Sequence, residues 1–188
     1  KFGRLIQKTI DLYEGLEAET GQNIGWHKCG QLRIAESADR MDEYLNYASI
    51  AQTQGVRAEI LTPEQTVDLW PLMQRSPNLL GAVYNPDDGH IAPADVTQAL
   101  AKGAKQLGAN IYLNTQVNTI DALPSGEWKV STNQGDIVCE HVVTATGNYV
   151  QQTARMLGME LPSFPILHQY WVTETVPQVR ERKDRGLP

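Results

Sequence analysis

The sequence has little of what identifies several classes of protein. Its two cysteines, Cys29 and Cys139, lie far apart and lack the spacing of metal ligands, so we expect neither a disulfide framework nor a zinc site. No run of about 18 apolar residues predicts a membrane span. Basic residues do not dominate, because the net charge is -6 and the one basic cluster is Arg180 to Arg185. Nucleic acid is therefore not expected as the main partner.

The composition is that of a globular protein with a sizeable core. The 188 residues are 41% hydrophobic and 20% charged, enough for one large domain or two small ones. The sequence opens at Lys1 inside a helical pattern and closes in a charged segment directly after a strand pattern. We therefore expect an internal part of a longer protein.

Helical periodicity and capping residues mark several helices. Ser37 is suited to be an N-cap, and Thr62 to Gln65 forms a capping box with proline at the first helical position. Ala92 stands where the helix that begins at Pro93 would need an N-cap. Gly103 lies inside that helix, and we expect it to allow close packing of the helix against a sheet. The predicted helices cover residues 2–19, 38–54, 63–70, 93–107 and 150–157.

Short β-branched or alternating runs separated by turn residues predict strands. The runs 127–132 and 136–138 form a hairpin around Asn133 to Gly135, which interrupts a parallel sheet. The result is a mixed α/β fold, an arrangement found in nucleotide-binding domains. The predicted strands cover residues 23–27, 31–35, 59–61, 79–85, 109–113, 115–121, 127–132, 136–138, 142–147 and 166–175.

The run Val142 to Gly147 is the predicted centre of the molecule. It reads as a buried strand that ends in small residues, and ligands bind outside the carboxyl ends of strands in open α/β sheets. Small residues there would let a cofactor approach the backbone closely. An ordinary core strand followed by a loop is the alternative interpretation.

Several short motifs, taken together and in their order, carry a resemblance that covers nearly the whole chain. They resemble the FAD-dependent oxidoreductases of the D-amino-acid oxidase superfamily, in particular the branch of dimethylglycine and sarcosine dehydrogenases. The motifs are ETGQ at 19–22, GWH at 25–27, GQLRIA at 30–35, LWPL at 69–72, YNPDDGHI at 84–91, LAKGA at 100–104 and HQY at 168–170.

The resemblance implies part of a two-domain flavoprotein. Residues 1–23 and 92–150 would belong to the FAD-binding domain, and residues 24–91 and 151–188 to a substrate domain built on an antiparallel sheet. The glycine-rich fingerprint that holds the pyrophosphate, and the histidine that carries covalent flavin in some members, would precede Lys1. A tetrahydrofolate-binding portion would follow. We therefore expect this chain alone to bind FAD poorly.

The implied reaction is oxidation of an N-methyl group of a small amine, with hydride transfer to the flavin. His168 is the candidate catalytic residue, because the matching histidine of the family faces the substrate and histidine can exchange a proton near neutral pH. Tyr170 lies two residues further along and is a candidate substrate contact. From the residues alone, a histidine hydrogen-bonded within a sheet and a tyrosine packed in the core stay open.

The same resemblance implies contacts to FAD. The strand that carries Val117 would run past the adenine, and Val117 would contact it through backbone groups. Ala145, Thr146 and Gly147 would lie near the pyrophosphate or ribose. Relatives have an aromatic residue two positions after the glycine, which here is Tyr149.

Two alternatives to an N-methylglycine dehydrogenase stay open. One is a non-catalytic relative that resembles the regulatory subunit of pyruvate dehydrogenase phosphatase, and the other is a flavin demethylase for another amine. The electron acceptor, and the choice between dehydrogenase and oxidase, are left open. The resemblance places the protein in the cytoplasm of a bacterium or the mitochondrial matrix of a eukaryote.

Overall fold

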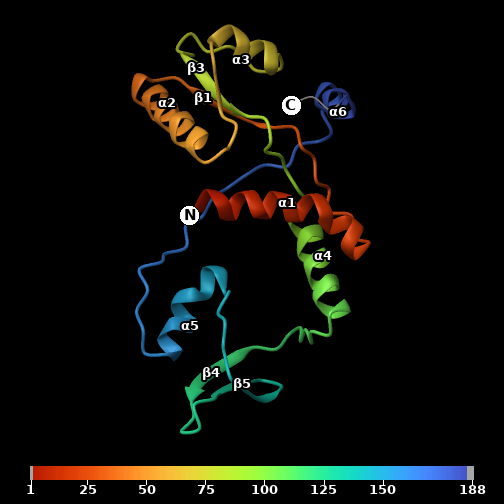
Figure 1. Cartoon of the computed structure of the whole chain (residues 1–188), viewed down its shortest axis with the longest axis vertical. Helices are drawn as coiled ribbons and strands as arrows, with labels where there is room; N and C mark the ends of the chain where they lie inside the picture. The colour runs from red at the N-terminus through yellow and green to blue at the C-terminus, as the bar shows by residue number, and fades with distance from the viewer. Residues whose placement is uncertain (1, 186–188) are drawn as a thin grey trace. The chain divides into compact units, whose positions relative to one another are not determined.

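The computed structural model describes residues 2–185, apart from the side chains of Phe2 and Arg4. The chain forms two compact units, the larger from Lys1–Asn110 with Thr173–Pro188 and the smaller from Ile111–Val172 (Figure 1). Residues 186–188, the end of the predicted substrate-domain segment, lie outside the description. Within the described range, no helix is long and apolar enough to cross a membrane.

An antiparallel sheet of three strands organises the larger unit. Its strands are β1 (Gln31–Ala35), β2 (Glu59–Leu61) and β3 (Gly81–Asn85), in the order β1-β3-β2. Val83 of β3 stands opposite Arg33 on one side and Ile60 on the other. Because β3 is hydrogen-bonded along both edges, Ala82 and Val83 are fully buried, at 0% exposure. The predicted antiparallel sheet is confirmed.

Two helices, α2 (Ala38–Thr53) and α3 (Pro63–Leu69), contact this sheet. Both begin as predicted. The side chain of Ser37 accepts a hydrogen bond from the Arg40 amide, and Thr62 and Gln65 form the reciprocal capping box. Tyr44 of α2 packs into the core and donates its hydroxyl proton to the Ile34 carbonyl at 3.3 Å.

Helices α1 (Phe2–Thr20) and α4 (Pro93–Gln106) pack against each other in the same unit (Figure 1). A Cβ atom added at Gly103 would lie 3.1 Å from the methyl group of Thr20. The glycine therefore allows close approach between two helices, which corrects the expectation of helix-to-sheet packing. Ala92 provides no side-chain cap, as predicted. The shared core consists of Leu16, Ile24, Val96 and Ala99.

The last helix of the larger unit, α6 (Pro177–Asp184), is tied to the end of α3. The Arg182 guanidinium lies 5.4 Å from the centre of the Trp70 ring, and its Nη2 donates to the Leu69 carbonyl at 2.6 Å. A cation over an aromatic face is favourable, and here the same group also satisfies a carbonyl near a helix end.

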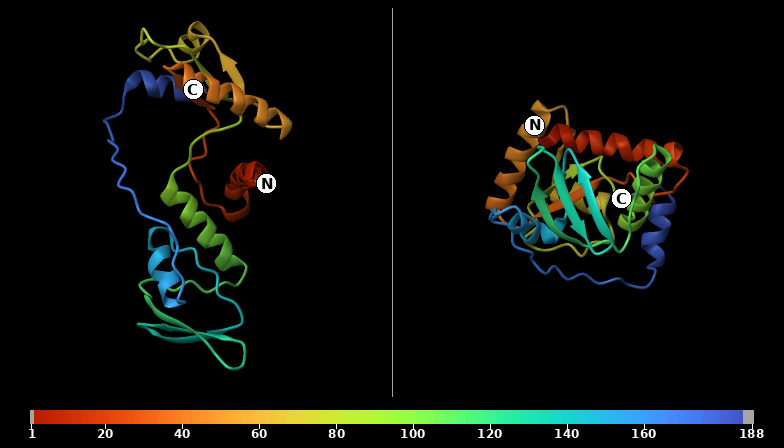
Figure 2. Two further views of the ribbon diagram at one scale, coloured as in Figure 1. Left: turned by 90° about the vertical axis from the view of Figure 1, so that its left-hand side faces the viewer. Right: turned by 90° about the horizontal axis from the view of Figure 1, so that it is seen from below.

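The smaller unit is a three-stranded antiparallel meander with a short helix. Strands β4 (Val117–Ala122), β5 (Trp128–Thr132) and β6 (Gly135–Cys139) lie side by side (Figure 2). The predicted hairpin is confirmed as β5 and β6. Both sheets of the described residues are antiparallel, so the parallel sheet that the hairpin was expected to interrupt is not formed there. A 3-10 turn, η1 (Gly147–Tyr149), leads into α5 (Val150–Met156).

Four predicted strands are wrong, namely 23–27, 109–113, 142–147 and 166–175. Residues 23–27 contribute one isolated bridge at His27, and the other three segments have no ladder within the described part of the chain. A strand is stable only when its backbone groups are paired by a neighbour, which a side-chain pattern does not specify.

The backbones of His27 and His90 clasp each other in the larger unit. The His27 amide donates to the His90 carbonyl at 2.9 Å, and the His90 amide donates back at 3.1 Å. Their rings meet edge to face at 5.1 Å, and Cys29 Sγ lies 3.5 Å from His90 Nδ1. A Cβ atom at Gly89 would collide with the His27 carbonyl, so this clasp requires glycine there.

This clasp predicts a dependence of stability on pH. Desolvation, then His27 and Lys183, lower the pKa of His90 from its ordinary 6.5. The unfolded chain therefore binds more protons, and the free energy of unfolding should fall as the pH drops through 6.5 towards the folded pKa. Denaturant unfolding of the full-length protein between neutral and mildly acidic pH measures this slope.

His90→Gln should flatten the slope, whereas His141→Gln, at an exposed histidine of the smaller unit, should leave it unchanged. Equal slopes for wild type and His90→Gln would contradict the assignment.

Candidate functional site

The predicted cofactor contacts Val117 and Thr146 line one cavity of the smaller unit. The cavity measures about 490 Å³ and lies between strands β4 and β5, the segment after β6, and α5. Val117 is the first residue of β4 and is 37% exposed. Val117 and Thr146 are 29 positions apart in sequence and the fold brings them together. The walls are mainly β-branched or apolar, with Ile120, Val130, Val142, Val143 and Met156 among them.

The hydroxyl of Thr146 has a partner that no motif predicted. Thr153 Oγ1 lies 3.1 Å from Thr146 Oγ1 and 3.3 Å from the Tyr149 carbonyl oxygen. Thr153 lies on α5 and is only 8% exposed, so this contact is held in a buried position. Thr153 has a single hydroxyl proton for the Thr146 hydroxyl and the Tyr149 carbonyl, so the contact anchors the Thr146 side chain without assigning a free proton to it.

Gly147 and Ala145 flank Thr146 without lining the cavity. Gly147 has a φ of 53°, and no atom lies within 4 Å of a Cβ atom built there. A left-handed residue beside open space leaves the backbone approachable and favours glycine. Ala145 is exposed. Tyr149, the aromatic residue that follows, does line the cavity.

His168 and Tyr170 lie elsewhere in the smaller unit, on a segment without regular structure. Both are exposed, Tyr170 by 82%, and neither lines the cavity. Alternate residues of this segment do not separate into a buried and an exposed face, because Leu167 and Trp171 are as exposed as Tyr170. The structure therefore brings part of the predicted cofactor set together, and the predicted catalytic residue His168 and substrate contact Tyr170 lie outside that cavity.

The sequence model of the DAO family, described as FAD dependent oxidoreductase, matches residues 1–188. The chain belongs to this family. The match covers both compact units described above.

Named relatives agree with this membership. The mitochondrial dimethylglycine dehydrogenase of Rattus norvegicus is 37% identical over 180 residues, which are 96% of this chain and 21% of the relative. The 4-methylaminobutanoate oxidase (formaldehyde-forming) of Paenarthrobacter nicotinovorans is 37% identical over 167 residues, 88% of this chain and 20% of that protein. The chain thus spans about a fifth of the length of these relatives.

A solved structure supports the fold. Glycine oxidase from Geobacillus kaustophilus superposes with a TM-score of 0.71 at 28% identity, covering 82% of this chain and 41% of that one. The mixed α/β architecture is therefore that of an oxidase of this family, and the fold prediction is confirmed.

The residues of the cavity fit part of an FAD molecule. A dinucleotide needs hydrogen-bond donors and close backbone approach at its phosphates and apolar walls at its rings. Thr146 brings a hydroxyl group to the cavity, the backbone of the adjoining Gly147 is open, and Val117 adds an apolar wall. These residues would hold a cofactor by contact.

Replacing Gly147 tests this fit. Gly147→Val in the full-length protein forces a β-branched residue into a left-handed conformation at a cost of about 1–3 kcal/mol, and places its side chain where the cofactor would approach. We expect FAD affinity to fall about tenfold, measured as the ratio of flavin to protein after dialysis.

Gly158→Val is the matched control, since Gly158 has a φ of 69° with equally open surroundings at the end of α5. It should cost similar stability and retain flavin. Loss of flavin in both variants to the same extent, or in neither, would argue against contact at Gly147.

Proposed function

We propose that the full-length protein is an FAD-dependent amine oxidoreductase that oxidises the N-methyl group of a dimethylglycine or sarcosine type of substrate. The observation that carries the proposal is the shared cavity of Val117 and Thr146, the residues that the family resemblance assigns to the cofactor. Family membership and the dimethylglycine dehydrogenase relative support the same chemistry.

The protein's own task in this reaction is to position the amine and to control its proton. Bound FAD would accept a hydride from the methyl carbon, and water would then release formaldehyde from the resulting imine. His168 is the proposed group that takes the proton of the amine or holds it in its neutral form, because only the neutral amine readily gives up hydride. Tyr170 is the proposed second contact to the amine.

The proposed assignment of residues to two domains follows the family resemblance. Residues 1–23 and 92–150 would serve the FAD-binding domain, and residues 24–91 and 151–188 the substrate domain. Tetrahydrofolate in a further domain is part of the proposal as an acceptor of the one-carbon product. The mitochondrial relatives support a matrix location for a eukaryotic form, and a bacterial form would be cytoplasmic.

A second candidate substrate is an N-methyl amine with a longer carbon chain. The relative named 4-methylaminobutanoate oxidase is as similar to this chain as the dimethylglycine dehydrogenase is, at 37% identity. The carboxylate would then lie further from the oxidised methyl group. The regulatory alternative differs from both, since it predicts no turnover of any amine.

Product analysis tests the reaction class. The full-length protein, given an electron-accepting dye and dimethylglycine, sarcosine or 4-methylaminobutanoate in turn, should release one formaldehyde for each amine consumed. The substrate with the highest kcat/KM identifies the amine. Absence of formaldehyde with every amine, from flavin-loaded protein, would favour the regulatory alternative.

The role of His168 has its own test. His168→Ala should slow reduction of the flavin by the amine about 10²-fold or more, the usual scale of general acid–base effects, as followed by stopped-flow absorbance. The rate should recover partly at high pH, where more of the amine is already neutral. His141→Ala, at another exposed histidine, is the control and should reduce normally. An unchanged rate in His168→Ala would remove this residue from the mechanism.

A further inference from the structure

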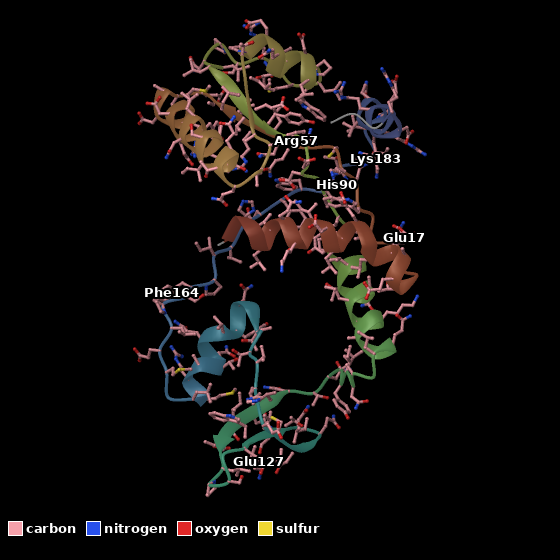
Figure 3. The ribbon with its side chains drawn as sticks, viewed as in Figure 1. Glu17, Arg57, His90, Glu127, Phe164 and Lys183 are labelled. Carbon is pink, nitrogen blue, oxygen red and sulfur yellow. The ribbon has the colours of Figure 1, made fainter. Side chains whose placement is uncertain are left out.

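A second cavity lies within the larger unit, and its lining residues precede the proposed flavin contacts in the sequence. It measures about 320 Å³, the size range of small-molecule sites. Apolar residues of α1 and α2, including Ile6, Ile10 and Ile50, form most of its wall. Its polar end is formed by residues of and around β3, among them Arg57, which Figure 3 labels below the sheet.

Asn85 lies at this polar end with half of its amide unsatisfied. The residue is 5% exposed, and its Nδ2 donates to the Tyr47 hydroxyl at 3.0 Å and to the Arg57 carbonyl at 3.1 Å. These donor contacts fix the orientation of the amide, because a flipped oxygen would face a carbonyl oxygen. Oδ1 is left buried with no hydrogen-bond partner among the described residues. A buried acceptor without a donor is costly and calls for a ligand or an ordered water.

Tyr47 leaves a donor beside this acceptor. Its hydroxyl oxygen accepts from Asn85, and no acceptor for its proton lies within the described part of the chain. Tyr47 also lines the cavity. An unused acceptor and an unused donor thus lie next to each other at one end of an apolar cavity.

The charges at this end are already balanced or unfavourable to an anion. Arg57 binds the Asp87 carboxylate through Nε, at 2.7 Å, and through Nη2, and these contacts lower the pKa of Asp87. Lys28 Nζ adds a contact to Asp87 at 3.6 Å. Asp88, also in the lining, carries a second negative charge and accepts from the Gly89 amide at 2.8 Å. A carboxylate ligand would be repelled by the negative charge of Asp88, and Arg57 is already paired with Asp87.

We propose that this cavity binds a small neutral molecule with a carboxamide head and a short aliphatic chain. The ligand amide N–H would donate to Asn85 Oδ1, and its carbonyl would accept the Tyr47 proton. The chain would lie against Ile6, Ile10 and Ile50. This site is independent of the flavin and of the amine substrate, and its occupation joins α1 to the sheet of the larger unit.

Hexanamide is the probe, and hexanoate is its matched control, since the two differ in the head group alone. Isothermal titration of the full-length protein should give saturable binding of hexanamide with a Kd below about 10 mM, reasonable for so few atoms. Hexanoate should bind at least about tenfold more weakly, because it lacks the N–H donor and carries a charge. Equal affinities for the two probes, or no saturable binding of hexanamide, would overturn the proposal.

Paired variants of α2 locate the binding. Ile50→Trp should fill the cavity and abolish hexanamide binding, whereas Leu45→Trp, at a residue of similar exposure (46% against 49%) outside the lining, should not affect it. Tyr47→Phe should weaken binding about fivefold, and Tyr44→Phe, whose hydroxyl contacts Ile34, should leave it unchanged.

Circular dichroism of each variant confirms the fold, and Tyr47→Phe keeps the test valid if Ile50→Trp does not fold. Binding that survives both Ile50→Trp and Tyr47→Phe would place hexanamide elsewhere and contradict the proposal. Because the readout is heat of binding, it is unaffected by whether the amine chemistry proposed above is correct.

Discussion

The pairing of β3 with β1 and β2 is the interaction on which the larger unit depends. β3 is hydrogen-bonded along both edges and is buried except at the half-buried Tyr84, which fixes where the chain leaves the sheet. The turn that follows then reaches several partners: the Gly30 amide donates to the Asp88 carbonyl at 2.8 Å, and Asp87 binds Arg57. The His27 and His90 clasp closes the same turn and directs the chain into α4.

In the smaller unit, strand pairing likewise fixes the position of a proposed cofactor contact. Strand β4 is held by β5, which is held in turn by β6, so Val117 stands at a fixed place at the start of a ladder. The segment that carries Thr146 and Gly147 has no ladder of its own. It is anchored instead by the buried Thr153 of α5. A site with one side on a sheet and the other on an anchored loop leaves backbone groups available to a ligand, which suits contact with a cofactor.

Features decided by neighbouring residues were predictable from the sequence, and features decided by distant partners were not. The caps at Ser37 and Thr62 and the hairpin of β5 and β6 need only a few consecutive residues, and all were confirmed. The alternating run 166–175 has an equally clear pattern but forms no strand, because pairing depends on a partner that the pattern does not name. Likewise, the contact of Thr153 with Thr146 and the unpaired oxygen of Asn85 could not be predicted from local sequence, because both depend on how the folded chain places other residues.

We propose that this chain is part of a protein that holds FAD and transfers electrons to it from an N-methyl amine. The most direct measurement is the visible spectrum of the purified full-length protein, recorded before and after dimethylglycine or sarcosine is added without oxygen. We expect a flavin band that bleaches on addition of the amine. A protein without flavin would contradict the cofactor contacts assigned to Val117, Thr146 and Gly147, and a flavin that no N-methyl amine bleaches would contradict the reaction.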